Sequence, residues 1–395
     1  MNLTLVTDFR FVRTPDGAVW TESVMGRSFF QRYLEVFDHV CVVARVKDVA
    51  EAAAGSSRIN EGGVSVWPLP YFVGPREMMA QLAALQHVSR QYFHRSEALL
   101  LRIPSHSSTI FSAASWWHKR PFGVEVVGNP NDAFSPEASQ HPLQKVFRSW
   151  FGVQQRWQCS HAACAAYVTK DAIQREFPPG KDAYTTHYSS IELGESAFVS
   201  QARRFSEQVD RPWHLLSVGS LEQLYKGQDI LIDAVAKCQQ QGLDVRLRFA
   251  GDGKFRGQLE AQVRDLGLEG KIEFLGMLPG SDAVRRALDD CDIFVLPSIT
   301  EGLPRAVIEA MARGLPCIGS TAGGIPELLP PEDCVPPADT SALADKIASF
   351  VRAPLSLNAK AERNLQLARE YHDSVLSARR MAFYTELKRR TKQGE

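Results

Sequence analysis

Hydrophobic and polar positions in the first half of the chain form short apolar runs separated by amphipathic stretches. The stretches at 25–37 and 76–95 have helical spacing. Continuous apolar runs between helices are typical of strands in a parallel sheet that helices cover on both faces. The pattern therefore predicts parallel strands at 3–8 (LTLVTD), 39–46 (HVCVVARV), 64–73 (VSVWPLPYFV), 98–105 (ALLLRIPS) and 121–130 (PFGVEVVGNP).

The same alternation restarts after residue 212 and is more regular there. Gly242 and Gly314 stand at the ends of two predicted helices, where a glycine is a common C-cap residue. Five β–α units in succession predict a doubly wound domain. The expected strands are 213–220, 245–253, 271–278, 292–298 and 315–320, and the expected helices are 227–242, 255–268, 282–291 and a segment that begins at Pro304 and ends before Gly314.

The length of the chain indicates two domains, since 395 residues exceed what one hydrophobic core usually supports. Segment 201–213 (QARRFSEQVDRPW) is polar, contains a proline and lacks a strand pattern, which favours a linker. We expect an amino-terminal domain over 1–205, a carboxyl-terminal domain over 206–370 and a basic helical end over 371–395. Two doubly wound α/β/α halves of this kind enclose a cleft.

Composition and charge exclude several classes of protein. The 45 Lys+Arg balance 45 Asp+Glu, which argues against a nucleic-acid-binding protein. No window reaches the roughly 18 uncharged apolar residues of a membrane span, and Asp8 and Arg10 come too early for a secretory signal. Seven scattered cysteines suit reduced thiols, so we expect a cytoplasmic protein. The close pair Cys159 and Cys164 suggests zinc, but no second ligand pair stands at metal-site spacing.

Residues that could bind an anion follow the predicted strands of the second half. Lys226 precedes a helix, where its charge, the helix dipole and backbone N–H groups could neutralise a phosphate; a surface lysine at a turn is the alternative. The turn 251–257 (GDGKFRG) lets a ligand approach the backbone. Its glycines have one residue too many for G-x-G-x-x-G and follow the wrong strand, which argues against an NAD oxidoreductase.

A second anion site is predicted at the helix start in SITEGLPRAVIEAMARGLPCIG (298–319). Pro304 suits the first helical turn, because its missing N–H would have no partner there. The N–H groups of Leu303, Arg305 and Ala306 would then be free to bind an anion without side chains.

Two carboxylates, Glu301 and Glu309, flank this helix start. A carboxylate can accept hydrogen bonds from vicinal hydroxyls such as those of a ribose. The pair therefore fits a ligand with a diphosphate in the middle and hydroxyls at both ends, which describes a nucleotide sugar. The alternative is an exposed i, i+4 ladder of Arg305, Glu309 and Arg313, which would stabilise the helix by a few tenths of a kcal/mol.

The ordered motifs of residues 212–330 resemble those of retaining glycosyltransferases of the GT-B fold, family 4 (glycosyl transferases group 1). They are SVGS, YKG, FAGDG, FLGMLP, VLPSITEGLPRAVIEAMARGLPCIGS and GGIPELL. The Glu-x7-Glu motif of that family corresponds to Glu301 and Glu309. In the first half, RYLEVFDHVCVVARV, LLRIPS, VEVVGNPNDAFSP and AAYVTKDAIQREFPP resemble a branch that builds bacterial surface polysaccharides.

The resemblance implies two Rossmann-like domains that face each other across a cleft. The amino-terminal domain would bind the acceptor, the carboxyl-terminal domain the nucleotide-sugar donor, and residues 371–395 would cross back to the amino-terminal domain. Glu309 would bind the ribose hydroxyls, while Glu301 would face the donor sugar and Lys226 would hold the diphosphate as the catalytic pair. The other implied donor contacts are Gly17, Ser220, Gly251, Gly253, Gly276, Met277, Gly302, Leu303, Pro304 and Arg305.

Ser220 departs from the family's pattern, which has an arginine six residues before the lysine. Arg305, Arg102 or a residue across the cleft could supply the missing charge, or the donor is held less tightly. The reaction implied is transfer of a sugar, with retention, from a nucleotide diphosphate sugar (a UDP-sugar is expected) to an acceptor hydroxyl. The family needs no metal or other cofactor.

Acceptor contacts are expected near the strand ends of the first half. The candidates are Arg102, Ser105, His106, Asn129 and Asp132. A solvated turn is the alternative for His106. Trp116 and Trp117 could stack on a sugar, or lie on a core or helix face.

Two other classes of protein would use a similar cleft. A GT-B isomerase would epimerise a nucleotide sugar without an acceptor, and a non-catalytic protein would bind the nucleotide sugar without turnover. The basic end ELKRRTK could touch anionic lipid and place the chain at the inner face of the membrane near a lipid-linked acceptor, or be a solvated helix end. The expected partners are a nucleotide-sugar donor and a saccharide or lipid-linked acceptor, and not nucleic acid.

Overall fold

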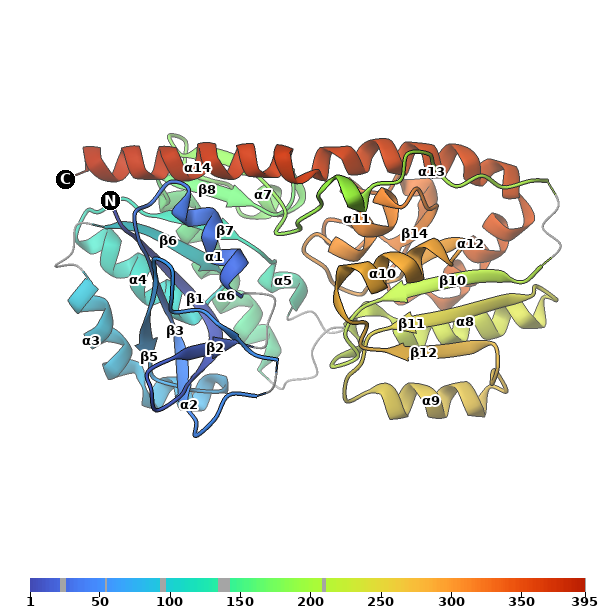
Figure 1. Ribbon diagram of the computed structural model, residues 1–395, viewed down its shortest axis with the longest axis horizontal. Coiled ribbons are helices and arrows are strands. Elements are labelled where there is room, and N and C mark those ends of the chain that lie inside the picture. Colours follow the sequence, from blue (N-terminus) through green and yellow to red (C-terminus); the bar gives the residue numbers. More distant parts are fainter. Residues whose placement is uncertain (22–25, 54, 93–96, 134–142, 208–210, 395) are drawn as a thin grey trace. The chain divides into compact units, whose positions relative to one another are not determined.

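The computed structural model describes residues 1–395 except 22–25, 54, 93–96, 134–142, 208–210 and 395. The chain divides into two compact units, each built around its own sheet (Figure 1). The first unit comprises Met1–Pro130, Ser149–Tyr188 and Ser377–Glu395, and the second comprises Asn131–Arg148 and Ser189–Leu376. Residue 205, where we expected the domain boundary, lies inside the second unit.

Among the described residues, nine strands form the sheet of the first unit. Seven of them run parallel in the order β5, β3, β1, β6, β7, β8, β9. The apolar runs predict the first five of these strands but not β8 and β9. The strands are β1 (Leu3–Arg13), β2 (Val19–Thr21), β3 (Val40–Asp48), β4 (Ser57–Arg58), β5 (Val64–Leu69), β6 (Ala98–Ile103), β7 (Gly123–Val126), β8 (Cys164–Tyr167) and β9 (Tyr184–His187).

The edge of this sheet differs from the prediction. β1 continues to Arg13, past its expected end at residue 8, and pairs antiparallel with β2, which pairs antiparallel with β4. The helices of this part of the chain are α1 (Arg27–Leu34), α2 (Gly74–Ala80), α3 (Leu82–Tyr92), α4 (His106–Trp117), α5 (Pro130–Ala133), α6 (Gln144–His161) and α7 (Ala172–Glu176).

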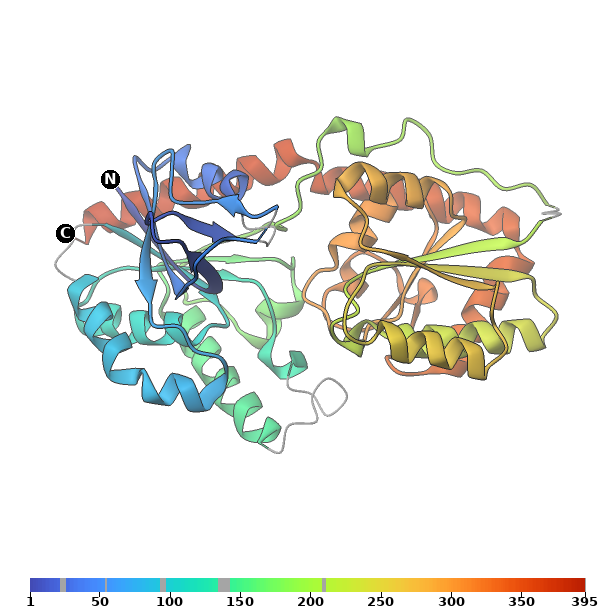
Figure 2. The same ribbon diagram turned by 60° about the horizontal axis from the view of Figure 1, so that its bottom comes forward.

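The sheet of the second unit has six strands within the described residues, in the order β12, β11, β10, β13, β14, β15, with every pair parallel. The strand order reverses between β10 and β13, which is where doubly wound sheets bind ligands. Figure 2 shows α8 and α9 on one face of this sheet and α10 on the other. The strands are β10 (Trp213–Val218), β11 (Val245–Ala250), β12 (Ile272–Gly276), β13 (Ile293–Leu296), β14 (Cys317–Ser320) and β15 (Cys334–Val335).

The helices of the second unit follow the predicted periodicity. In α8, Leu231, Val235 and Cys238 recur at i, i+4 and i+7, are fully buried, and pack in one core cluster with Leu247 and Ile293 of the sheet. Burial of each such aliphatic side chain contributes roughly 1.5–3 kcal/mol. The helices are α8 (Gln228–Gln240), α9 (Arg256–Asp265), α10 (Gly280–Asp289), α11 (Arg305–Ala312), α12 (Thr340–Arg352) and α13 (Pro354–Ala368).

Two predicted helix ends are confirmed. Gly242 and Gly314 have φ of +76° and +65°, directly after the C-caps of α8 and α11. The basic helical end expected over 371–395 is α14 (Asp373–Gln393), which a 3-10 turn separates from α13. His372 is extended there, and the Asp373 N–H donates to the Leu193 carbonyl at 2.8 Å.

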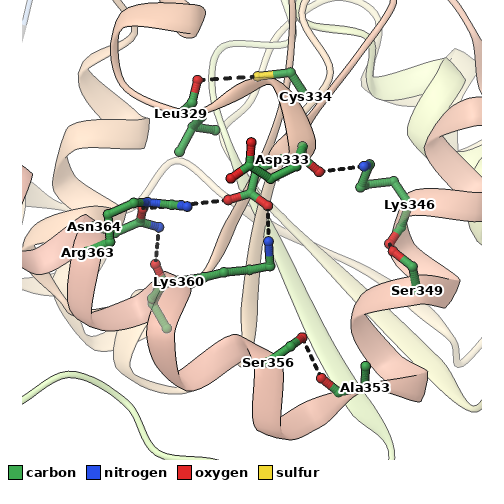
Figure 3. Close-up of polar contacts among 12 residues, drawn as sticks. Leu329, Asp333, Cys334, Lys346, Ser349, Ala353, Ser356, Lys360, Arg363 and Asn364 are labelled. Carbon is green, nitrogen blue, oxygen red and sulfur yellow. Dashed lines mark hydrogen bonds and ion pairs between the residues drawn. The ribbon is translucent and has the colours of Figure 1, made fainter.

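A buried ion cluster attaches α13 to the edge of the second sheet (Figure 3). The Asp333 side chain is fully buried beside β15, and it accepts hydrogen bonds from Lys360 and from Arg363, the latter at 2.6 Å. Asn364 donates to the Leu315 carbonyl at 2.8 Å. Two cations thus neutralise one buried carboxylate at the point where α13 meets the sheet.

No helix among the described residues is both long enough and apolar enough to cross a membrane.

Candidate active site

The loops that follow β10, β11 and β13 are joined by backbone hydrogen bonds. The Leu221 N–H donates to the Asp252 carbonyl at 2.9 Å, which joins the β10 loop to the β11 loop. The Ile299 N–H donates to the Tyr225 carbonyl at 2.7 Å, which joins the β13 loop to the β10 loop. Because these strands lie at the point where the strand order reverses, their loops form one continuous edge where a ligand can bind.

Two glycines let these loops approach closely. Gly251 has φ of +146°, and a Cβ there would lie 1.9 Å from the Gly219 carbonyl oxygen. Gly323 has φ of +52°, and its Cβ would lie 1.9 Å from the Glu301 carbonyl oxygen. A larger residue at either position would therefore displace a loop of the edge, and at Gly323 that loop carries Glu301.

Lys226 and Glu301 form an ion pair at this edge, although they are far apart in the sequence. The Lys226 Nζ donates to the Glu301 Oε1 at 2.6 Å, and the Ser298 Oγ donates to the same oxygen at 2.9 Å. The side chains of Lys226 and Glu301 are only 15% and 10% exposed, so water screens the pair weakly. A phosphate that reached this ammonium group would compete with Glu301 for it.

The N-terminus of α11 lies in the loop that contains Glu301. Pro304 is the N-cap, one position before the first helical turn in which the sequence placed it. In the part of the chain that the structure describes, the N–H groups of Leu303, Arg305 and Ala306 have no acceptor. These donors stand at the positive end of the helix dipole, where an anion binds favourably.

Glu309 lies in the second turn of α11 and is mostly buried. Burial raises the pKa of its carboxyl, and the charges of Arg305 and Arg285 oppose this increase. A cavity of about 20 Å³, enough for one water-sized molecule, is lined by Glu309, Glu192, Ser281 and Arg285 among others. Glu309 makes no hydrogen bond or ion pair within the described ranges, so its carboxylate is available to a ligand.

The exposed ladder of Arg305, Glu309 and Arg313 does not form. Arg313 instead donates two hydrogen bonds to the Asp289 carboxylate, at 2.7 and 2.8 Å. The i, i+4 spacing suggested the ladder, but Asp289 at the end of α10 is the partner that the fold brings to Arg313. Glu309 is therefore not part of a solvated ladder with Arg313.

Ser220 cannot replace the charge of the arginine that the family has at this position. Its Oγ accepts a hydrogen bond from the Glu222 N–H at 3.2 Å, and its carbonyl accepts one from Gln228 at 3.1 Å. Arg305, the first residue of α11, is exposed beside the free N–H groups. Within the second unit it is therefore the better candidate for a second positive charge.

The remaining donor candidates lie in turns. The Gly253 N–H bonds the Asp252 carboxylate at 2.8 Å, and the Gly276 carbonyl accepts from the Gly251 N–H at 2.9 Å. Met277 follows with 72% of its surface exposed. These residues lie on the same loop edge as Lys226.

Two further donor candidates, Gly302 and Gly17, lie in other turns. The Gly302 carbonyl accepts from the Gly324 N–H at 2.7 Å, which holds the Glu301 loop against the β14 loop. Gly17 lies in the exposed turn between β1 and β2 of the first unit, with φ of +80°, and its N–H donates to the Thr14 carbonyl at 2.9 Å.

Arg102 is occupied by a buried cluster in the first unit. Its guanidinium bonds the carboxylate of Glu125, which also accepts hydrogen bonds from Tyr33, Tyr188 and Tyr384 at 2.9 to 3.3 Å. Burial lowers and the Glu125 charge raises the pKa of Arg102, with a net increase, so it stays cationic. The cluster offers no free charge to an acceptor or a diphosphate.

The other acceptor candidates have structural contacts. Ser105 is the N-cap of α4 and accepts from the Ser108 N–H. The His106 ring packs on Phe151, and burial lowers its pKa. Asn129 donates to Glu176 at 3.1 Å. Asp132 lies in α5, and its side chain lies outside the described residues.

Ser298 and Arg285 belong to the site but were not predicted. Ser298 bonds Glu301, and its carbonyl accepts from the Ser320 hydroxyl, which ties the end of β13 to β14. Arg285 of α10 pairs with Asp282 and lines the same small cavity as Glu309. The position of Ser298 directly after a buried strand was an available signal, whereas the place of Arg285 beside Glu309 depends on the tertiary fold.

Comparisons with known proteins find similarity to glycosyltransferases. The family Glycosyl transferases group 1 matches residues 199–367, which contain every loop of the candidate edge. Protein CapJ of Staphylococcus aureus is 25% identical over 349 residues, covering 88% of this chain and 85% of CapJ. The putative colanic acid biosynthesis glycosyltransferase WcaL of Escherichia coli is 36% identical over 148 residues, which cover 35% of this chain and 36% of WcaL.

A solved structure shows the same fold over nearly the whole chain. HepE of Anabaena, crystallised in complex with UDP, has a TM-score of 0.65 at 18% identity and covers 97% of this chain and 98% of its own. The chain thus has the GT-B fold, as the sequence predicts, and the matches to its second unit are to group 1 glycosyltransferases.

Proposed function

We propose that this chain, a group 1 glycosyltransferase, moves a sugar with retention from a UDP-sugar to an acceptor hydroxyl in bacterial polysaccharide synthesis. The observation that carries the proposal is the ion pair of Lys226 and Glu301 beside the free N–H groups of α11. Preorganised donors at one point stabilise the charge that develops on a leaving diphosphate. The complex of HepE with UDP supports UDP as the nucleotide, and the similarity to WcaL supports polysaccharide synthesis.

In this proposal the β-phosphate takes the place of Glu301 at the Lys226 ammonium group, and Glu301 turns to the hydroxyls of the donor sugar. Arg305 and the N–H groups of Leu303 and Ala306 hold the remaining phosphate oxygens. Glu309 accepts hydrogen bonds from the ribose hydroxyls. Because Glu309 is mostly buried and forms no ion pair in the described part of the chain, it suits an acceptor of hydroxyl protons better than a structural ion pair.

The transfer step breaks the bond between the anomeric carbon and the diphosphate oxygen. A bond from the acceptor oxygen to the same face of that carbon replaces it, and the acceptor proton passes to the departing diphosphate. No side chain is then needed as a base. An isomerase is less well supported, because the named relatives with this domain are glycosyltransferases.

A panel of UDP-, GDP- and ADP-sugars tests the proposal by thermal shift and then by release of nucleoside diphosphate. We expect stabilisation by UDP-sugars at millimolar concentration and loss of that stabilisation in Lys226→Met. Lys237→Met is the matched control, because Lys237 lies in the adjacent helix α8 and bonds Ser341. If no nucleotide sugar stabilises the protein, or if both variants respond like the wild type, the proposed donor site is wrong.

A further inference from the structure

The first unit carries an exposed aromatic surface on two helices. Trp116 and Trp117 end α4 and are 55% and 78% exposed, and Trp150 and Val153 of α6 are 61% and 70% exposed. The Trp116 ring contacts Trp157 edge to face, with centroids 6.2 Å apart, which connects the two helices. We call these five residues the tryptophan face.

The spacing within α6 shows that its apolar side chains share one side of the helix. Trp150, Val153 and Trp157 stand at i, i+3 and i+7, so they form a stripe along the axis. Single exposed apolar residues are ordinary on protein surfaces, but contiguous exposed tryptophans mark an interaction site. None of these side chains belongs to the donor edge of the second unit.

Cations border the tryptophan face. An open pocket of about 540 Å³ is lined by Trp116 together with Lys119, Arg120, Arg389 and Arg390. Glu386 pairs with the two arginines of α14 and offsets one of their charges. The described sequence of α6 contains three basic residues and no acidic one, and that of α4 contains no Asp, Glu, Lys or Arg.

We propose that the tryptophan face and its basic pocket dock this protein on an anionic phospholipid bilayer. Tryptophan rings favour the level of the lipid headgroups, where an apolar body and a polar N–H are both satisfied. The cations complement the negative surface potential of such a bilayer. A second copy of the chain fits less well, because two equally basic faces would repel each other.

Docking on a bilayer does not depend on the proposed transfer reaction, since vesicle binding requires no nucleotide sugar. Sedimentation with vesicles of phosphatidylcholine and phosphatidylglycerol, against phosphatidylcholine alone, tests it with the full chain. We expect binding to the anionic vesicles that weakens as salt is raised from about 0.1 to about 0.5 M. Quenching of tryptophan emission by brominated lipid should accompany it.

Two double variants separate the apolar and the electrostatic contributions. Trp117→Ser with Trp150→Ser should weaken vesicle binding about ten-fold. Lys119→Glu with Arg156→Glu, which changes the exposed arginine that precedes Trp157 in α6, should weaken it on the order of 30-fold, since each basic side chain near the surface is worth roughly 1 kcal/mol. The matched controls are Leu355→Ser and Arg264→Glu, an exposed apolar residue and an exposed cation of the second unit.

Several results would overturn the proposal. Two of them concern the wild type: failure to sediment with anionic vesicles, and equal binding to neutral vesicles. Control variants as weak as the face variants would show that the effect is not local. A dimer in solution that Trp150→Ser dissociates, without vesicle binding, would assign the face to self-association. Unchanged circular dichroism and melting temperature would establish that the variants are folded.

Discussion

The raised pKa of Glu309 gives a prediction in which stability and ligand binding change in opposite directions. Burial favours the protonated carboxyl in the folded chain, so the pKa there exceeds its ordinary value of 4.5. The contribution of the protonated carboxyl to the free energy of unfolding is fully present below pH 4.5 and is lost as the pH rises through the raised pKa. Glu309→Gln removes this loss, because the amide carries no charge at any pH.

We therefore expect the melting temperature of Glu309→Gln, compared with that of the wild type, to depend on pH. The difference in favour of the variant should be larger at about pH 7.5 than at about pH 4. Binding of UDP should change the other way. A hydrogen bond to a charged group contributes about 1.5–3 kcal/mol, so loss of the carboxylate should raise the Kd for UDP roughly 10- to 150-fold. Isothermal titration calorimetry measures the Kd, and differential scanning calorimetry measures the melting temperature at both pH values.

Glu273→Gln is the matched control, because Glu273 is an exposed glutamate of β12 in the same unit. It should change neither the Kd nor the pH dependence. A Glu309→Gln protein that binds UDP within about two-fold of the wild type would refute the role at the ribose. A difference in melting temperature that is the same at both pH values would refute the argument from burial.

Three other changes test the second unit and the thiols. Asp333→Asn should lower the free energy of unfolding by about 3–5 kcal/mol in urea titration, because it leaves the cations of Lys360 and Arg363 without their buried partner; a loss below about 1 kcal/mol, as expected of a surface pair, would contradict this. Gly323→Ala should abolish UDP binding in calorimetry, because the new Cβ meets the Glu301 carbonyl. The control Gly257→Ala, whose Cβ has no atom within 4 Å, should bind UDP normally. Equal binding by the two variants would contradict this prediction. All seven cysteines are buried and free, so Ellman's reagent should label seven thiols in urea and almost none in the native protein; rapid native labelling would show that the units open.

The sequence predicts the second unit more closely than the first. Its strands are short, continuous apolar runs, and its helices end at glycines, so Gly242 and Gly314 mark the correct boundaries. In the first unit the antiparallel strands β2 and β4 were missed, because strands of three and two residues carry too little alternation to be seen.

The candidate site was predictable in its residue types but not in its contacts. The motifs identify Lys226, Glu301 and Glu309, yet the ion pair between the first two depends on loops 75 residues apart in the chain. Spacing alone favoured a ladder at Glu309, but Arg313 bonds Asp289 at the end of α10 instead. Arg102 was a reasonable candidate for an acceptor contact because it lies near a strand end. The sequence could not show that the fold pairs it with Glu125.

The buried cluster at Glu125 also determines when the first unit can be finished. One of its three tyrosines, Tyr384, belongs to α14, whose Phe383 and Leu387 are also fully buried in that unit. These residues follow Ser189–Leu376 in the sequence, so a ribosome adds them after it has made most of the second unit. The core of the first unit therefore cannot be completed before that point. A chain that stopped before α14 would leave uncovered the apolar surface that Phe383, Tyr384 and Leu387 bury.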